Sequence, residues 1–156
     1  MTNMTPRLLA ALVLGALVSS HAWAAEPVTP KLTDKLDRLL RQEMRSVQSA
    51  MGTIHTAMVT GQHEKVAENA QQVHDSFILQ QSLTEQDRKD LKSAVPQGFI
   101  ELDKRFHALS GQLAEAGKQE DTRKQRQLYD QMTGNCIQCH ATYVSDRFPG
   151  VEYREQ

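Results

Sequence analysis

Apolar residues recur at intervals of three and four along most of the chain, a spacing that gathers them on one face of an α-helix. Sustained alternation of apolar and polar residues, the pattern of a β-strand, does not occur after residue 25. Four long helices are predicted, over residues 29–61, 62–77, 99–117 and 120–145. We therefore expect an all-α protein, folded as an antiparallel up-and-down four-helix bundle.

The helix boundaries and core stripes follow from the same pattern. The first helix is expected to begin at Thr29-Pro30 and to end at Gly61. A short capped helix should precede the third long one, because Thr84 and Asp87 have capping-box spacing. The core stripe of the first helix is predicted to be Leu36, Leu40, Met44, Val47, Met51, Ile54 and Met58. The later stripes are predicted to be Val66, Ala70, Val73 and Phe77; Phe99, Leu102, Phe106, Leu109 and Leu113; and Leu128, Met132, Cys136, Cys139 and Tyr143.

The first 24 residues have the features of a secretory signal peptide. Arg7 precedes an apolar run from Leu8 to Val18, and Ala22-Trp23-Ala24 supplies the small residues of a cleavage site. A retained anchor is the less favoured alternative, because crossing a bilayer takes roughly 20 apolar residues. We expect residues 1–24 to be removed and residues 25–156 to form one exported domain.

Charge and hydropathy limit the kinds of partner that we expect for that domain. The 18 basic and 19 acidic residues are mixed along the chain, so the sequence predicts no basic surface for nucleic acid. After the first 24 residues, no apolar run is long enough to span a membrane. We therefore expect no nucleic-acid partner and no stable membrane insertion after cleavage.

Both cysteines of the chain lie in one C-x-x-C-H motif, formed by Cys136, Cys139 and His140. On a helix these three residues share a face. Cysteines at this spacing attach to the two vinyl groups of a haem, and the adjacent histidine binds the iron. The predicted export supports this interpretation, because c-type haem is attached outside the bacterial inner membrane.

Three other uses of the cysteine pair are less favoured. A disulfide closing so short a loop would constrain little of the unfolded chain. A thioredoxin-like dithiol belongs beside a βαβ pattern, which the sequence does not show. A closed zinc site would need a fourth protein ligand. The histidines that might supply one are expected to be surface or boundary residues: His55, His63, His74 and His107.

The motif's position near the C-terminus, on the last helix of a four-helix chain, resembles the class II c-type cytochromes, the cytochrome c′ and cytochrome c-556 group. Weaker matches are Arg41-Gln42, the turn at Val59-Thr60-Gly61-Gln62, and Tyr143 after the motif. The family often has a basic residue directly after that tyrosine. Here Val144 follows, and the next basic residue is Arg147.

The resemblance implies one covalent haem c per chain, with thioether bonds to Cys136 and Cys139 and His140 as the proximal iron ligand. It implies a periplasmic single-electron carrier rather than an enzyme, with redox proteins as partners. If the second axial position stays open, as in cytochrome c′, the protein would instead bind nitric oxide or carbon monoxide. Relatives are often homodimers. The alternative of another class is a helical dithiol or metal-binding protein without haem.

The second axial ligand separates carrier from gas binder. In low-spin relatives it is a methionine of the first helix, and the interval from Arg41-Gln42 favours Met44 as that residue. An ungapped count back from Gly61 instead places the position on Arg45, about 100° around the helix and away from the apolar stripe. Met51 and Met58 are expected to fill the core. The resemblance also makes Arg41 a candidate partner for a haem propionate.

Overall fold

The computed structural model of the chain describes residues 26–76 and 83–153. The predicted signal peptide and Phe77 lie outside these ranges. Within them the chain is all-helical, with five α-helices, one short 3-10 helix and no strand, so the all-α prediction is confirmed. The elements are η1 (Thr29–Lys31), α1 (Asp34–Val59), α2 (His63–Asp75), α4 (Glu85–Ala94), α5 (Gln97–Lys118) and α6 (Thr122–Tyr143).

Local sequence signals set most of the helix ends. The predicted start of the first helix is wrong by a few residues. Thr29-Pro30 opens the 3-10 turn instead, and α1 begins after Thr33, whose side chain accepts a hydrogen bond from the Leu36 amide at 3.3 Å. Gly61 follows the helix in the left-handed region, at φ 69°, as glycine favours. The capping box of α4 is confirmed at Thr84 and Asp87.

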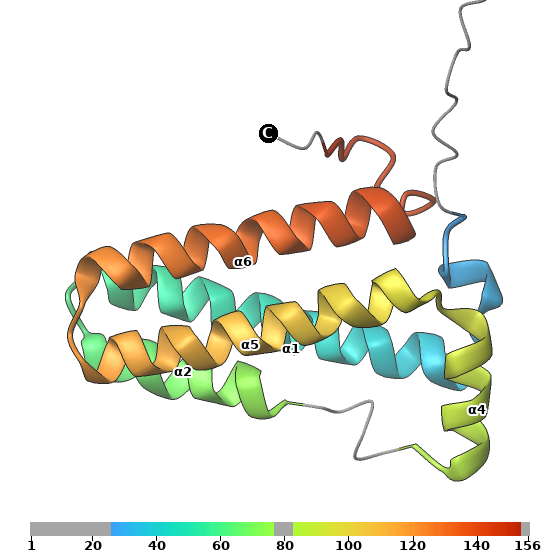
Figure 1. The fold of residues 1–156 in the computed structure, drawn as a ribbon, viewed down its shortest axis with the longest axis horizontal. Coiled ribbons are helices and arrows are strands. Elements are labelled where there is room, and N and C mark those ends of the chain that lie inside the picture. Colours follow the sequence, from blue (N-terminus) through green and yellow to red (C-terminus); the bar gives the residue numbers. More distant parts are fainter. Residues whose placement is uncertain (1–25, 77–82, 154–156) are drawn as a thin grey trace, which may run out of the picture.

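Four long helices, α1, α2, α5 and α6, lie alongside one another, and α4 crosses one end (Figure 1). The tightest pairing is between α2 and α5. A Cβ atom at Gly117 would lie 2.7 Å from the Ala67 backbone nitrogen, so only glycine permits this approach. Ser110 adds a hydrogen bond of 2.6 Å from its hydroxyl to the Ala70 carbonyl. By contrast, α6 packs mainly on α5 and makes little contact with α1.

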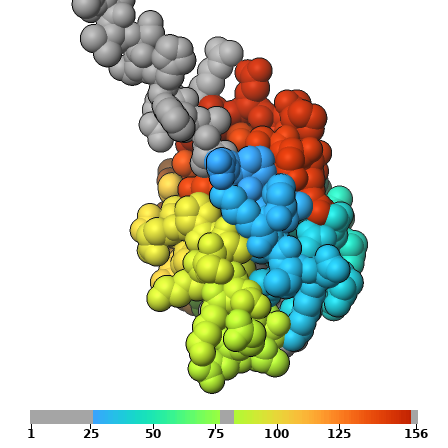
Figure 2. Space-filling model, turned by 90° about the vertical axis from the view of Figure 1, so that its right-hand side faces the viewer, coloured from blue at the N-terminus to red at the C-terminus, as the bar shows by residue number. Residues whose placement is uncertain are grey.

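The buried apolar residues form two clusters. The larger one fills the interior between the long helices, and Met51, Met58, Tyr129 and Cys136 pack against it. The smaller one comprises Val28, Ala94, Val95 and Phe99 at the end covered by α4, and Cys139 and Tyr143 are among the residues packed against it. Figure 2 views this end and shows the start of the described chain, in blue, between α4 and the C-terminal residues, in red. The two cysteines therefore lie where the two clusters meet.

The buried face of α1 differs from the predicted stripe at one position. Glu43 is only 3% exposed, whereas Met44 is 39% exposed. The face centred on Leu36, Val47, Ala50 and Ile54 includes position 43 and leaves position 44 at its edge. The other stripes are confirmed as buried or partly buried wherever the chain is described. Among the described helices, none is long and apolar enough to cross a membrane.

Candidate functional site

The C-x-x-C-H motif occupies the last two turns of α6. The side chains of Cys136 and Cys139 are partly buried and pack against the larger and the smaller apolar cluster, respectively. Both thiols are free, with no disulfide between them. The sequence prediction that the pair shares the inward face of the last helix is confirmed.

Burial makes both thiols weak acids. It raises the pKa of Cys139 to about 12, with a further contribution from the negative charge of Asp103, and it also raises the pKa of Cys136. A redox-active dithiol needs the thiolate at neutral pH, and such cysteines have lowered pKa values. The environment of this pair is therefore the opposite of a thiol-exchange site, and the dithiol alternative gains no support from it.

His140 is half-buried, and its ring stacks on that of Phe148, with centroids 4.6 Å apart and planes inclined by 16°. Burial lowers the pKa of His140, which favours the neutral imidazole. Neutral imidazole is the form that binds metal ions and haem iron. The state of this side chain thus fits a role as an iron ligand.

Two contacts tie α6 and the segment after it to α1. The hydroxyl of Tyr129 donates a hydrogen bond of 3.3 Å to the Met51 carbonyl, and Arg147 pairs with Asp37 at 2.9 Å. Tyr129 meets Met51 near the end of α1, whereas Arg147, after α6, meets Asp37 near its start, so the two helices are antiparallel (Figure 1). One of these ties precedes the cysteine motif in the sequence, and the other follows it. Together they fix which turns of the two helices face each other.

Met44 lies between the two ties, at the level of the motif. It precedes Met51 by seven residues, and Cys136 follows Tyr129 by seven residues. Antiparallel helices that advance 1.5 Å per residue therefore bring Met44 opposite the turn that begins at Cys136. A spacing of seven also puts Met44 on the same side of α1 as Met51, the side that faces α6. Because α1 and α6 make little contact, Met44 remains partly exposed there.

Arg41, the candidate propionate partner, lies one turn from Asp37 and forms an ion pair with it at 2.8 Å. Asp37 also accepts the hydrogen bond from Arg147 at 2.9 Å. Arg147, the first basic residue after Tyr143, thus attaches the segment after α6 to α1. The Arg41 side chain itself is exposed to solvent.

Sequence reasoning missed a buried polar cluster beside the site. His107 was expected to be a surface or boundary residue, and this is wrong, because it is only 4% exposed. Its Nδ1 lies 2.8 Å from the Val73 carbonyl. Its Nε2 lies 3.7 Å from Asp103 and 3.9 Å from Glu43. The signal in the sequence was the acidic residue four positions before His107, a spacing at which helical side chains meet.

The pKa of His107 reflects opposing effects. Burial by itself lowers the pKa, but the hydrogen bond and charge of Asp103 raise it. The Val73 carbonyl and the charge of Glu43 act in the same direction as Asp103, and the pKa is raised above its ordinary value. The His107 imidazole and the carboxyl groups of Asp103 and Glu43 thus lie together next to the α1 turn that carries Met44.

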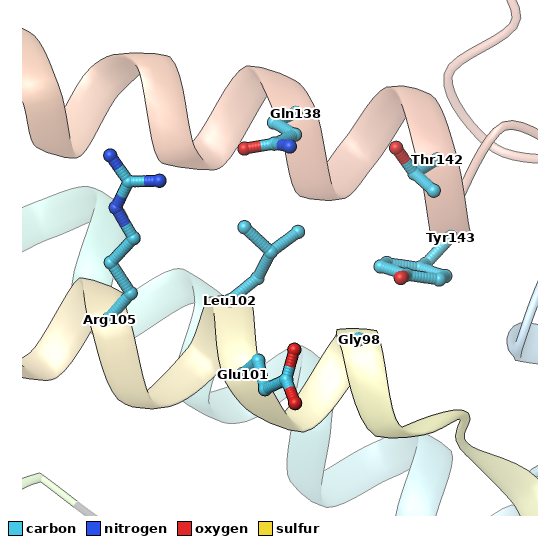
Figure 3. Close-up of a pocket in the computed structure, with 7 residues that line it drawn as sticks. All are labelled: Gly98, Glu101, Leu102, Arg105, Gln138, Thr142 and Tyr143. Carbon is cyan, nitrogen blue, oxygen red and sulfur yellow. The ribbon is translucent and has the colours of Figure 1, made fainter.

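A groove of about 390 Å³ opens between α5 and α6 on the flank of the motif (Figure 3). Its lining residues are Gly98, Glu101, Leu102, Arg105, Gln138, Thr142 and Tyr143. The Tyr143 hydroxyl lies over Gly98, where a Cβ atom would collide with it. Nearby, Asn135 donates to the Leu102 carbonyl at 3.0 Å, and its buried Oδ1 has no hydrogen-bond partner among the described residues. The helix bearing the motif is thus incompletely packed on this side as well as toward α1.

The side chains around the motif could hold a c-type haem. The thiols of Cys136 and Cys139, the imidazole of His140 and the thioether of Met44 lie at one level of the α1–α6 pair, and both cysteines pack against the apolar clusters. In the part of the chain that the structure describes, no three His, Cys, Asp or Glu side chains gather to hold a metal ion. Comparisons with protein families, curated proteins and solved structures find no match to this chain.

Proposed function

We propose that this chain is an exported single-electron carrier of the class II c-type cytochrome kind, with one covalent haem c. Cys136 and Cys139 would hold the edge of the ring through thioethers, and His140 would bind the iron. Met44 would bind it from α1. In this proposal α1, α2, α5 and α6 are the helices of an antiparallel up-and-down four-helix bundle, and residues 1–24 are a signal peptide. The protein would act in the periplasm, between redox partner proteins.

One observation carries the proposal: Met44 of α1 and the motif of α6 lie at the same level on facing sides of two helices that make little contact there. The haem supplies a one-electron couple when bound. Each residue then has a defined task. The imidazole of His140 is kept neutral by burial, and the soft sulfur of Met44 favours reduced iron. The apolar clusters limit water and support a raised potential.

Arg41 would neutralise a propionate from the exposed end of the site, next to Asp37 and Arg147. The side chain is exposed, so the charge interaction would be screened by salt and worth little by itself, about 0 to 1 kcal/mol. Arg41 is therefore proposed to orient the group rather than to hold it.

A second function is favoured by the exposure of Met44, whose side chain is 39% exposed. If Met44 stays away from the iron, that side of the ring is open, and the protein would bind carbon monoxide or nitric oxide. A helical protein without haem is the third alternative. The raised pKa values of both thiols give no support to its dithiol version.

The test is to express the whole chain with a c-type haem maturation system and to record haem content and visible spectra. A haem that stays with the denatured chain, with low-spin spectra unchanged by carbon monoxide, is the expected result. A Cys136→Ser, Cys139→Ser double variant should carry no covalent haem. Free thiols in the wild-type protein after such expression would contradict the haem proposal. Ready carbon monoxide binding would contradict the electron-carrier function and support the gas-binding one.

A further inference from the structure

The segment after α6 folds back over the motif instead of running away from it. Its backbone turns are closed by hydrogen bonds of 3.0 Å from Arg147 to Val144 and of 3.1 Å from Phe148 to Val144. The Arg147 side chain reaches Asp37 on α1. Phe148 therefore belongs to a hydrogen-bonded turn, directly follows the residue of the ion pair, and lies beside His140.

The Phe148 side chain is placed in an unusual way for a large apolar residue. It remains 41% exposed, so it is not part of either buried apolar cluster. Its ring forms a nearly parallel stack on that of His140, with centroids 4.6 Å apart. Simple core filling therefore does not account for its position.

Within the described part of the chain, no hydrogen bond orients the His140 ring. Histidine ligands of metals almost always donate their second ring N–H to a carboxylate, carbonyl or water, which fixes the plane of the imidazole. Among the described residues, no such hydrogen bond to the His140 ring is present. A flat aromatic ring lying parallel to the imidazole restricts the same rotation by contact.

We propose that Phe148 is a positioning residue for the His140 ligand, held in place by the Arg147–Asp37 ion pair. The inference rests on the proposed function, since it assigns a task toward the iron ligand. In this role Phe148 touches neither the iron nor the edge of the haem. It sets the plane of the His140 imidazole. Stacking of two rings favours one orientation of the imidazole by about two- to tenfold. Removing the Phe148 ring should therefore raise the share of the turned imidazole by that factor.

The test uses the intact haem-loaded protein and four variants. Phe148→Ala removes the ring, Phe148→Leu keeps apolar volume without a flat ring, and Phe148→Tyr keeps the flat ring. Tyr153→Ala is the matched control, because Tyr153 is a similarly exposed aromatic residue of the same segment. The readout is the pattern of the haem methyl proton shifts in the ferric protein, which follows the plane of the axial imidazole.

Phe148→Ala and Phe148→Leu should alter the order of the methyl shifts or add a second set of signals, whereas Phe148→Tyr and Tyr153→Ala should keep the wild-type pattern. An unaltered pattern in both the alanine and leucine variants would overturn the proposal, as would equal effects of Tyr153→Ala. Haem staining of the denatured chains separates the two levels of inference. Without covalent haem both proposals fall; with covalent haem and no effect at position 148, only the positioning role falls.

Discussion

The hydroxyl of Tyr129 donates a hydrogen bond to the carbonyl of Met51 at 3.3 Å, and this contact sets the register between α6 and α1. It distinguishes three methionines that share the predicted apolar stripe of the first helix. Met51 lies at the level of Tyr129, about 10 Å along the helix from the cysteine motif, and Met58 lies twice as far. Met44 is the methionine of α1 that lies level with the motif.

Replacing Met44 should therefore change the spin state of the iron without unfolding the protein. Met44→Ala in the haem-loaded protein is expected to convert low-spin spectra to high-spin spectra and to permit carbon monoxide binding. Its cost in stability should be small, because the side chain is 39% exposed. Absorption spectra of both oxidation states, with and without carbon monoxide, measure the effect.

Met51→Ala is the matched control for that variant. Met51 lies on the same side of α1 but packs against the larger apolar cluster, so its loss should lower the free energy of unfolding and leave the low-spin spectrum in place. A Met44→Ala protein that remains low-spin would show that Met44 is not the iron ligand.

The tight approach of α2 and α5 predicts a marked difference between two glycine substitutions. A Cβ atom at Gly117 would lie 2.7 Å from backbone atoms of Ala67, which have no flexible end to move aside. Gly117→Ala should lower the free energy of unfolding by about 1–3 kcal/mol. Gly52 in α1 has nothing within 4 Å of such an atom, so Gly52→Ala should raise it by about 0.5–1 kcal/mol. Urea denaturation of both variants tests the pair, and equal effects would contradict the packing explanation.

Periodicity predicted much of this structure because it depends on local spacing alone. The all-α class, the capped α4 and the inward face of Cys136 and Cys139 all follow from three- and four-residue intervals and from side chains close in sequence. The same rule failed where a tertiary partner decides. Glu43 is buried in place of Met44, and its carboxyl group lies 3.9 Å from His107 on α5. That partner is distant in sequence, and no local pattern reveals it.

The site shows the same division. The motif and its helix are local features, whereas the level of Met44 depends on ties between α1 and the far end of the chain. The stack of Phe148 on His140 depends on how the segment after α6 turns back. Neither relationship has a spacing rule, so both required the fold.

Asp87 should make stability fall in acid over a defined range. The hydrogen bond from Lys35, together with those from Thr84, holds the pKa of Asp87 at about 2, below its ordinary value of 3.8. A carboxyl group with a depressed pKa stabilises the fold above its unfolded pKa, and this contribution is lost as pH falls through the folded value. The Asp87 contribution should be complete at pH 7 and should decline from about pH 4 toward about pH 2.

Asp87→Asn is the variant that measures this contribution. It should be less stable than wild type at neutral pH, and the difference should close as the pH approaches 2. Asp90→Asn controls for the loss of a carboxylate on the same helix, since Asp90 pairs with Gln86 rather than with another helix. A difference between wild type and Asp87→Asn that stays constant from pH 7 to pH 2 would contradict the assignment.

His107 should give the opposite dependence on pH. Although burial lowers its pKa, the nearby Asp103, the Val73 carbonyl and Glu43 raise it on balance. A histidine with a raised pKa stabilises the fold fully below its unfolded value, about 6.5, and the contribution is lost as pH rises through the folded value. His107→Gln retains a donor for the Val73 carbonyl but cannot become charged. Urea denaturation between pH 5.5 and pH 9 should show the advantage of wild type over His107→Gln shrinking as pH rises, while His55→Gln, at an exposed position of α1, should follow wild type throughout. An advantage that grows with pH would contradict the raised pKa and would mean that His107 is held neutral in the fold.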